Sequence, residues 1–175
     1  MNATAAAAAK HATASAVQPR PDAPAPDRMT ATLPDLVARS NQYASVVRLT
    51  LITMVVRDYD EAIAFFTEVL GFDLVEDSPS LTNDGRPKRW VVVRPPGAET
   101  GILLAQADGQ EQAAVVGKQA ARRVGFFLRV DDFDASYQRM LAAGVEFVTA
   151  PRTEPYGQVC VFRDIAGNRW DLLGP

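Results

Sequence analysis

The side chains that usually carry covalent and metal chemistry are scarce in this chain of 175 residues. Histidine and cysteine each occur once, as His11 and Cys160. A metal site with several histidines, a zinc site made of cysteines and an intramolecular disulfide are therefore excluded within one chain. Cys160 lies between Val159 and Val161, and we expect a buried, inert thiol there.

Other catalytic motifs are also missing from the sequence. It has no glycine-rich phosphate loop followed by Lys and Ser or Thr, and no Gly-x-Ser-x-Gly turn. We interpret Arg122 and Arg123 as a solvated pair at the entrance of a strand rather than as a phosphate site. The net charge of -3 argues against a nucleic-acid or anionic membrane partner. No apolar run approaches the roughly 20 residues of a membrane-spanning helix, and we expect a cytoplasmic protein.

Residues 1–45 predict a disordered Ala/Pro-rich tail and lead-in. Its first part has no large aliphatic residue except Val17, so it buries too little apolar surface to offset the entropy of ordering. His11 lies in this tail, where a solvated side chain is expected and a catalytic Ser–His–Asp or Cys–His pair is not. An organellar presequence and a start codon misplaced ahead of Met29 are two further interpretations of this segment.

Residues 46–106 predict a strand, a helix and three further strands. An apolar run rich in β-branched residues ends at Val56, and Asp58 with Glu61 makes a capping-box-like helix start. Apolar residues then recur at helical spacing until Gly71, which is typical of a left-handed helix end. The strands that follow are expected at 72–76, 89–94 and 101–106, with a turn at 83–85.

The same order of elements returns in residues 123–174. A linker at 107–122, which we expect to hold a short helical turn, separates the two copies. A strand at 124–130 precedes Asp132, which starts a helix that ends at Gly144. Three more strands are predicted at 145–148, 158–163 and 169–173. We therefore expect an α+β domain at 46–174, in which paired β-α-β-β-β modules form a curved mixed sheet around a cleft, with the helices outside.

Two segments of these modules resemble the vicinal oxygen chelate superfamily, which includes glyoxalase I, bleomycin-resistance proteins and extradiol dioxygenases. Residues 55–66, followed by Leu70-Gly71-Phe72, are similar to the opening motif of that superfamily, and residues 162–172 are similar to its final hairpin. One departure is local, because Ile165 follows Asp164 where the superfamily usually has proline. The resemblance covers both modules and implies their pairing.

The resemblance also implies where a divalent metal would bind in metal-dependent members. The ligand positions fall on Leu51, on Gly125, on Asp171, and on Ile102 or Leu103. Only Asp171 offers an oxygen atom from its side chain, and none of these positions offers a nitrogen. The reactions of the superfamily need a metal held by His and carboxylate ligands. We therefore expect no metal and no other cofactor.

Four functions remain open for such a domain. The first is a metal-free protein that binds an apolar or aromatic small molecule in the cleft, as drug-sequestering members of the superfamily do. The second is an enzyme that uses Asp171 as a general base without a metal. The third is a metal-dependent lyase, isomerase or dioxygenase of the superfamily, and the fourth is a structural or regulatory dimer module. We expect a small-molecule ligand as partner and a homodimer.

The residues expected to contact the ligand are Leu51, Thr53, Trp90, Gly125, Phe127 and Tyr156, with Asp171 as a polar anchor or base. Gly125 is expected to leave room beside the ligand, and the aromatic side chains to stack on it. Each aromatic side chain has a competing interpretation as core filling. Asp171 has one as the partner of a nearby arginine, which would be Arg94, Arg123, Arg129 or Arg169.

Overall fold

The computed structural model describes residues 47–175, which form one compact unit. The predictions for the tail, His11 included, lie outside the described residues. Twelve elements follow one another along the described part of the chain. None of its helices is long and apolar enough to cross a membrane.

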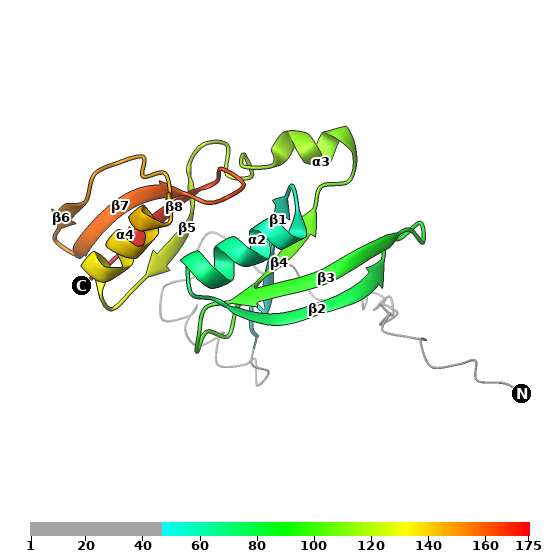
Figure 1. Cartoon of the computed structure of the whole chain (residues 1–175), viewed down its shortest axis with the longest axis horizontal. Helices are drawn as coiled ribbons and strands as arrows, with labels where there is room; N and C mark the ends of the chain where they lie inside the picture. Colours follow the sequence, from blue (N-terminus) through cyan, green and yellow to red (C-terminus); the bar gives the residue numbers. More distant parts are fainter. Residues whose placement is uncertain (1–46) are drawn as a thin grey trace, which may run out of the picture. The chain divides into compact units, whose positions relative to one another are not determined.

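Module one forms a four-stranded mixed sheet with strand order β1-β4-β3-β2 (Figure 1). Its elements are β1 (Leu51–Val56), α2 (Tyr59–Ala64), η1 (Phe65–Val69), β2 (Asp73–Leu81), β3 (Pro87–Arg94) and β4 (Gly101–Gln106). β1 runs parallel to β4, and the other pairs are antiparallel. The predicted strand–helix–three-strand order is confirmed, and β2 continues five residues beyond its expected end at residue 76.

The first helix begins and ends at the residues that the sequence indicates. The Asp58 Oδ1 atom accepts hydrogen bonds from the backbone amides of Asp60 at 2.9 Å and Glu61 at 3.0 Å, which satisfies two orphan donors of the first turn. Gly71 follows the helix with a φ of +77°, a left-handed conformation that costs glycine little. The last turn, η1, is a π-helix, and α2 with η1 covers one face of the sheet with Ala62, Phe65 and Phe66.

Module two repeats the same strand order as β5-β8-β7-β6 in a second four-stranded sheet. After the linker helix α3 (Gly109–Val115), its elements are β5 (Val124–Arg129), α4 (Phe133–Ala142), β6 (Arg152–Glu154), β7 (Gly157–Arg163) and β8 (Arg169–Leu173). Asp132 accepts a hydrogen bond from the Ala135 amide at 2.9 Å, which confirms the second helix cap. The α+β class and the paired modules are confirmed.

One predicted strand of module two is wrong. Residues 145–148 form only an isolated bridge between Phe147 and Phe162, and the fourth strand of the sheet is instead β6. Val145 is buried and Phe147 packs on the core, which explains the apolar character of the segment without strand pairing. Apolar alternation over four residues does not distinguish a packed loop from a strand.

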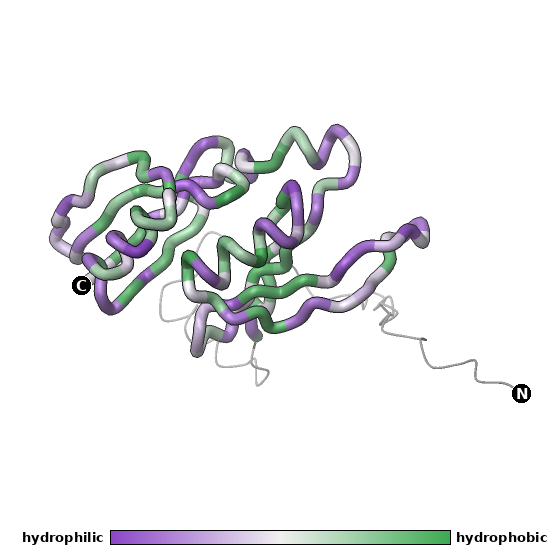
Figure 2. The backbone as a smooth tube through the Cα atoms, viewed as in Figure 1, coloured by the Kyte–Doolittle hydropathy of each residue, from purple (hydrophilic) through white to green (hydrophobic). Residues whose placement is uncertain are grey.

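The helix-covered faces of the two sheets share one hydrophobic core. Phe66 of η1 lies 6.0 Å from Trp170 of β8, measured between ring centroids, and Phe126 of β5 stacks on Trp170 at 4.5 Å. Figure 2 shows the hydrophobic residues along β1 and β4 and hydrophilic residues at the tip of the β2–β3 hairpin. Because both covered faces meet this core, the uncovered faces of the two sheets both point away from it.

A buried carboxylate organises the turn between β7 and β8. Asp164 accepts hydrogen bonds from the amides of Gly167 at 2.8 Å and Asn168 at 2.9 Å, and from Asn168 Nδ2 at 3.0 Å. It also accepts one from Trp170 Nε1 at 2.9 Å, which ties the turn to the core. Ile165, which stands where the superfamily usually has proline, is half exposed. The hydrogen bonds of Asp164 hold the turn without a proline ring.

Candidate functional site

The candidate residues of module one share the uncovered face of the first sheet. Leu51 and Thr53 alternate with the core residue Met54 along β1, and Thr53 pairs in register with Leu103 of β4. Val91 and Val93 of β3 point into the core. Because side chains alternate along a strand, Trp90 lies on the opposite face, which it shares with Leu51 and Thr53. We call this surface, defined by Leu51, Thr53, Trp90 and Leu103, the module-one face.

The candidate residues of module two lie on the equivalent face of the second sheet. Phe127 of β5 pairs in register with Asp171 of β8, and Asp171 pairs with Val161 of β7. Their neighbours Phe126, Trp170 and Phe162 point into the core. The Phe127 side chain is 66% exposed. We call this surface, defined by Phe127, Val161 and Asp171, the module-two face.

Asp171 is the titratable group of the module-two face. Partial burial raises the pKa of its carboxyl group above the ordinary value, and the positive charge of Arg152 opposes this in part. None of the ion pairs recorded between described residues involves Asp171, so the four arginines considered from the sequence are not its partners. A half-buried carboxyl group of this kind is suited to hold a ligand hydroxyl or amine, or to accept a proton.

Arg152 of β6 is a member of the module-two face that the sequence did not indicate. Its guanidinium pairs with Glu154, with 2.9 Å between Nε and Oε1. The hydrogen bond to Glu154 raises the pKa of Arg152 most, and the negative charge of Asp171 adds to this. Tyr156 lies in the turn between β6 and β7 and is 58% exposed. No pattern in the sequence indicated that Arg152 belongs to this face, because strand β6 itself was not predicted.

Gly125 is exposed, but the linker loop limits the room expected beside it on the side where its Cβ would point. The register between β5 and β8 shifts between Val124 and Phe126, at Gly125. A Cβ atom on Gly125 would lie 2.8 Å from the Cβ of Ala120, closer than side chains tolerate. The same loop holds β1, because the Gln119 side chain accepts from the Val55 amide at 2.9 Å and donates to the Thr53 carbonyl at 3.2 Å.

The residues at the metal-ligand positions do not fit a divalent ion. Leu51, Ile102 and Leu103 carry no donor atom in their side chains, and Gly125 has no side chain. Asp171 is the one carboxylate among these positions, and a divalent ion needs several protein ligands for tight binding. Among the described residues, no group of three His, Cys, Asp or Glu side chains is placed to hold a metal.

The two candidate faces are not joined within one chain. No strand pairing links the two sheets in residues 47–175, and both faces point away from the common core. The structure therefore places Phe127 and Asp171 on one face of module two, with Tyr156 in the β6–β7 turn, and Leu51, Thr53 and Trp90 on one face of module one. Phe127 and Tyr156 are mostly exposed, so the core-filling interpretation fails for both.

Cys160 takes no part in either face. It is fully buried among the core residues of β7, as expected, and carries no disulfide. Burial raises the pKa of its thiol to about 11. A thiol that stays protonated at neutral pH is a poor nucleophile.

Comparisons with known proteins identify the family of this domain. The family model described as "Glyoxalase/Bleomycin resistance protein/Dioxygenase superfamily" matches residues 48–172. A protein of Shewanella frigidimarina (strain NCIMB 400) is 50% identical over 123 residues, which cover 70% of this chain and 89% of that protein. The family-model match spans the part of the chain that forms the two modules.

Solved structures share the same fold. TnmS3, an antibiotic binding protein from Streptomyces sp. CB03234, superposes with a TM-score of 0.59 at 30% identity, over 76% of this chain and 99% of TnmS3. A superfamily member from Sphaerobacter thermophilus DSM 20745 gives a TM-score of 0.58 at 28% identity, over 74% of this chain and 98% of that structure. The chain belongs to the glyoxalase/bleomycin resistance protein/dioxygenase superfamily.

Proposed function

We propose that this protein binds an apolar or aromatic small molecule without a metal, and that the module-two face is the centre of the site. The observation that carries the proposal is the pairing of Phe127 with Asp171. An exposed aromatic ring offers a stacking surface, and the half-buried carboxyl group beside it offers one polar anchor. An apolar surface with few polar groups is typical of small-molecule sites.

The likeness to TnmS3 supports this function. That protein is described as an antibiotic binding protein, and the two chains are 30% identical over nearly its whole length. The side chains at the implied metal-ligand positions support the metal-free part of the proposal. Leucine, isoleucine and glycine stand where metal-dependent members of the superfamily need ligands. A ligand of this chain would then be held by stacking and burial rather than by chelation.

The site is completed, in this proposal, by a second copy of the chain. The module-one and module-two faces of one chain point away from their common core, so they cannot enclose one ligand between them. In a homodimer, the module-one face of one protomer lies over the module-two face of its partner, and the Trp90 ring then faces the ligand from the opposite side. Phe127, 66% exposed in the single chain, is covered in this arrangement.

A second candidate function is turnover with Asp171 as a general base. The raised pKa of its carboxyl group favours this alternative, since a base works best when its pKa approaches the working pH. Binding and turnover differ in a simple way, because a binding protein returns its ligand unchanged. Incubation of the protein with each ligand that stabilises it, followed by mass spectrometry of the ligand, separates the two functions.

The binding proposal is tested with uncharged planar aromatic compounds such as acridone, coumarin and 2-naphthol. Thermal shift and isothermal titration are measured on the wild type, on Phe127→Ala, and on Leu141→Ala as a control. Leu141 is a half-exposed leucine of α4, away from both faces. We expect stabilisation of the wild type and of Leu141→Ala, and affinity about tenfold or more weaker in Phe127→Ala. Stabilisation that Phe127→Ala leaves unchanged would contradict the proposed site.

A further inference from the structure

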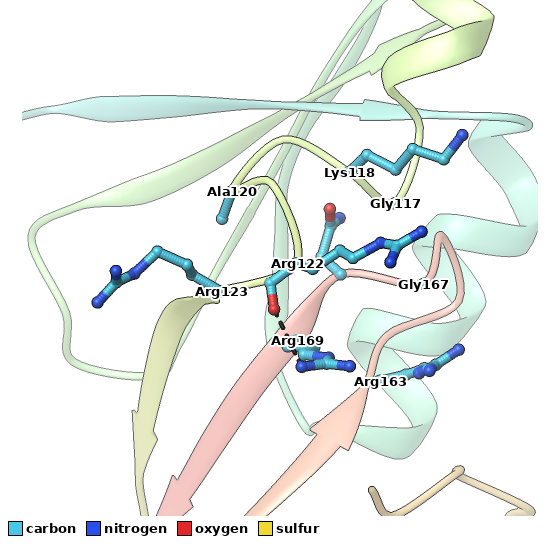
Figure 3. A pocket seen from close by; sticks show the side chains of 9 residues that line it. Gly117, Lys118, Ala120, Arg122, Arg123, Arg163, Gly167 and Arg169 are labelled. Carbon is cyan, nitrogen blue, oxygen red and sulfur yellow. Dashed lines mark hydrogen bonds between the residues drawn. The ribbon is translucent and has the colours of Figure 1, made fainter.

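A pocket of about 330 Å³ lies between the linker loop and the β7–β8 turn, outside both candidate faces. Its lining contains five cationic side chains and no acidic one: Lys118, Arg122, Arg123, Arg163 and Arg169. Gly117, Ala120, Gly167 and Asn168 complete the lining. We call this cavity the basic pocket (Figure 3).

A side chain of β8 holds the end of the linker loop. Arg169 Nη1 donates to the Arg122 carbonyl oxygen at 3.0 Å, two residues before β5 begins. Ala121 and Arg122 have φ values of +48° and +70°, which residues with a Cβ adopt at a cost. A loop kept in this conformation by its surroundings presents its side chains in a defined arrangement.

The positive charge of the basic pocket is largely uncompensated. Among the described residues, the only ion pair of a lining side chain joins Arg163 Nε to Glu146 Oε1 at 3.4 Å. The other four cations have no carboxylate partner in that part of the chain. In Figure 3, Lys118 and Arg122 extend in the same direction, whereas Arg123 extends the opposite way. Like charges gathered in a concave site repel one another and favour a bound anion.

A buried polar atom adds a second, independent sign of a ligand. Asn168 is 3% exposed, and its Oδ1 atom has no hydrogen-bond partner. The Nδ2 atom donates to Asp164 Oδ2 at 3.0 Å, and a carboxylate accepts only, so the amide orientation is fixed. The atom left over is therefore an acceptor. An unpaired buried acceptor costs stability unless a donor reaches it.

We propose that the basic pocket binds a small phosphate ester that carries a hydroxyl group beside its phosphate, such as a sugar phosphate. The phosphate pairs with the guanidinium groups of Arg122 and Arg169 and with Lys118, since arginine forks match phosphate oxygens. The hydroxyl group donates to Asn168 Oδ1, which is enclosed by the protein in the free chain, so binding includes a small shift of the side chains around this atom. A small anion fits better than a nucleic acid, because the whole chain has a net charge of -3 and the positive surface is local.

This inference is independent of the proposed function. The basic pocket shares no lining residue with the module-one face or with Phe127, Val161 and Asp171. The sequence favoured a solvated pair at Arg122 and Arg123, because the residues that complete the pocket lie about forty positions later in the chain. Loss of phosphate binding in a variant would leave the binding of uncharged aromatic compounds unchanged.

Isothermal titration at low ionic strength tests the inference with glucose 6-phosphate, methyl phosphate and glucose. The variant is Arg122→Asn, because asparagine tolerates the left-handed backbone and keeps the carbonyl that Arg169 holds. Arg123→Asn is the matched control: it removes the same charge from the same lining, but the Arg123 side chain extends away from Lys118 and Arg122 (Figure 3) and has no contact with the phosphate in this proposal. Lys118→Gln is a second pocket variant, and melting temperatures show that each variant folds.

We expect saturable binding of glucose 6-phosphate, weakened about tenfold or more by Arg122→Asn and by Lys118→Gln, and much less by Arg123→Asn. Methyl phosphate, which lacks the hydroxyl group, should bind about fivefold more weakly, and glucose should not bind. The proposed site would be overturned if glucose 6-phosphate did not bind, or if Arg122→Asn and Arg123→Asn weakened its affinity equally. Methyl phosphate binding as tightly as glucose 6-phosphate would overturn the role of Asn168.

Discussion

Ala120 of the linker loop occupies the space that a side chain at Gly125 would need. A Cβ atom on Gly125 would lie 2.8 Å from the Ala120 Cβ, and Ala120 can move away only if the loop backbone moves with it. A side chain at this position, where the family resemblance implies a metal ligand, would thus meet a segment from between the modules. Leu51, at another of the implied positions, offers no donor atom from its side chain.

The contact between Ala120 and Gly125 predicts a dependence of one substitution on the other. Gly125→Ala alone should destabilise the protein by about 1–3 kcal/mol through overpacking. The same substitution in an Ala120→Gly background should be neutral or slightly stabilising, because the clash is gone and the unfolded chain loses freedom. Urea unfolding of the two single variants and the double variant measures this coupling. Additive effects would show that the loop does not press on Gly125.

The raised pKa of Asp171 predicts that its ionisation costs stability. The unfolded carboxyl group ionises near its ordinary value of 3.8 and the folded one at higher pH, so the folded state holds more protons between these values. Stability is therefore lost as the pH rises through the folded pKa. Asp171→Asn should be more stable than the wild type at pH 7, and this advantage should disappear below the ordinary value.

Urea unfolding at a series of pH values measures the advantage of Asp171→Asn. Asp131→Asn, which removes an exposed carboxylate at the start of α4, is the control. If Asp171→Asn were less stable than the wild type at pH 7, the carboxylate would be stabilised by a partner rather than destabilised by burial.

Asp164 should be essential for the fold of module two. It is 5% exposed and accepts from two backbone amides, from Asn168 Nδ2 and from Trp170 Nε1. Asp164→Ala leaves these donors buried and unpaired, and should lower the free energy of unfolding by about 3 kcal/mol or more. Trp170 fluorescence during unfolding reports the loss. A change below about 0.5 kcal/mol, as expected for a surface site, would show that the network contributes little.

Cys160 should resist modification in the folded protein. The thiol is buried and burial raises its pKa to about 11, so little thiolate forms at pH 8. A disulfide-exchange reagent such as DTNB should react slowly with the native protein and rapidly in urea. Equal rates in both conditions would place the thiol at the surface.

Local signals in the sequence predicted much of the fold. Asp58 and Asp132 cap their helices, and Gly71 and Gly144 end them with positive φ angles, because each acts through atoms a few residues away. Non-local features could not be predicted in this way. Three features depend on tertiary contacts: the approach of Ala120 to Gly125, the place of Arg152 on the short strand β6, and the gathering of cations in the basic pocket.

The candidate site was predicted only in part. Alternation along residues 124–130 separated Phe127 from Phe126, whereas Asp171 was named from the family resemblance, and the register between β5 and β8 places Phe127 opposite Asp171. Whether that face is covered depends on a partner surface, which no spacing in a single sequence reveals. The exposure of Phe127 and Tyr156 therefore became clear only in the folded chain.

The central claim, a ligand held without a metal, is tested most directly by one titration in two states of the protein. Acridone binding is measured by calorimetry before and after exhaustive treatment with a chelator, with elemental analysis of both samples. We predict the same affinity in both states and no stoichiometric metal in either. Stoichiometric Zn, Ni, Mn or Fe whose removal abolishes binding would contradict the claim.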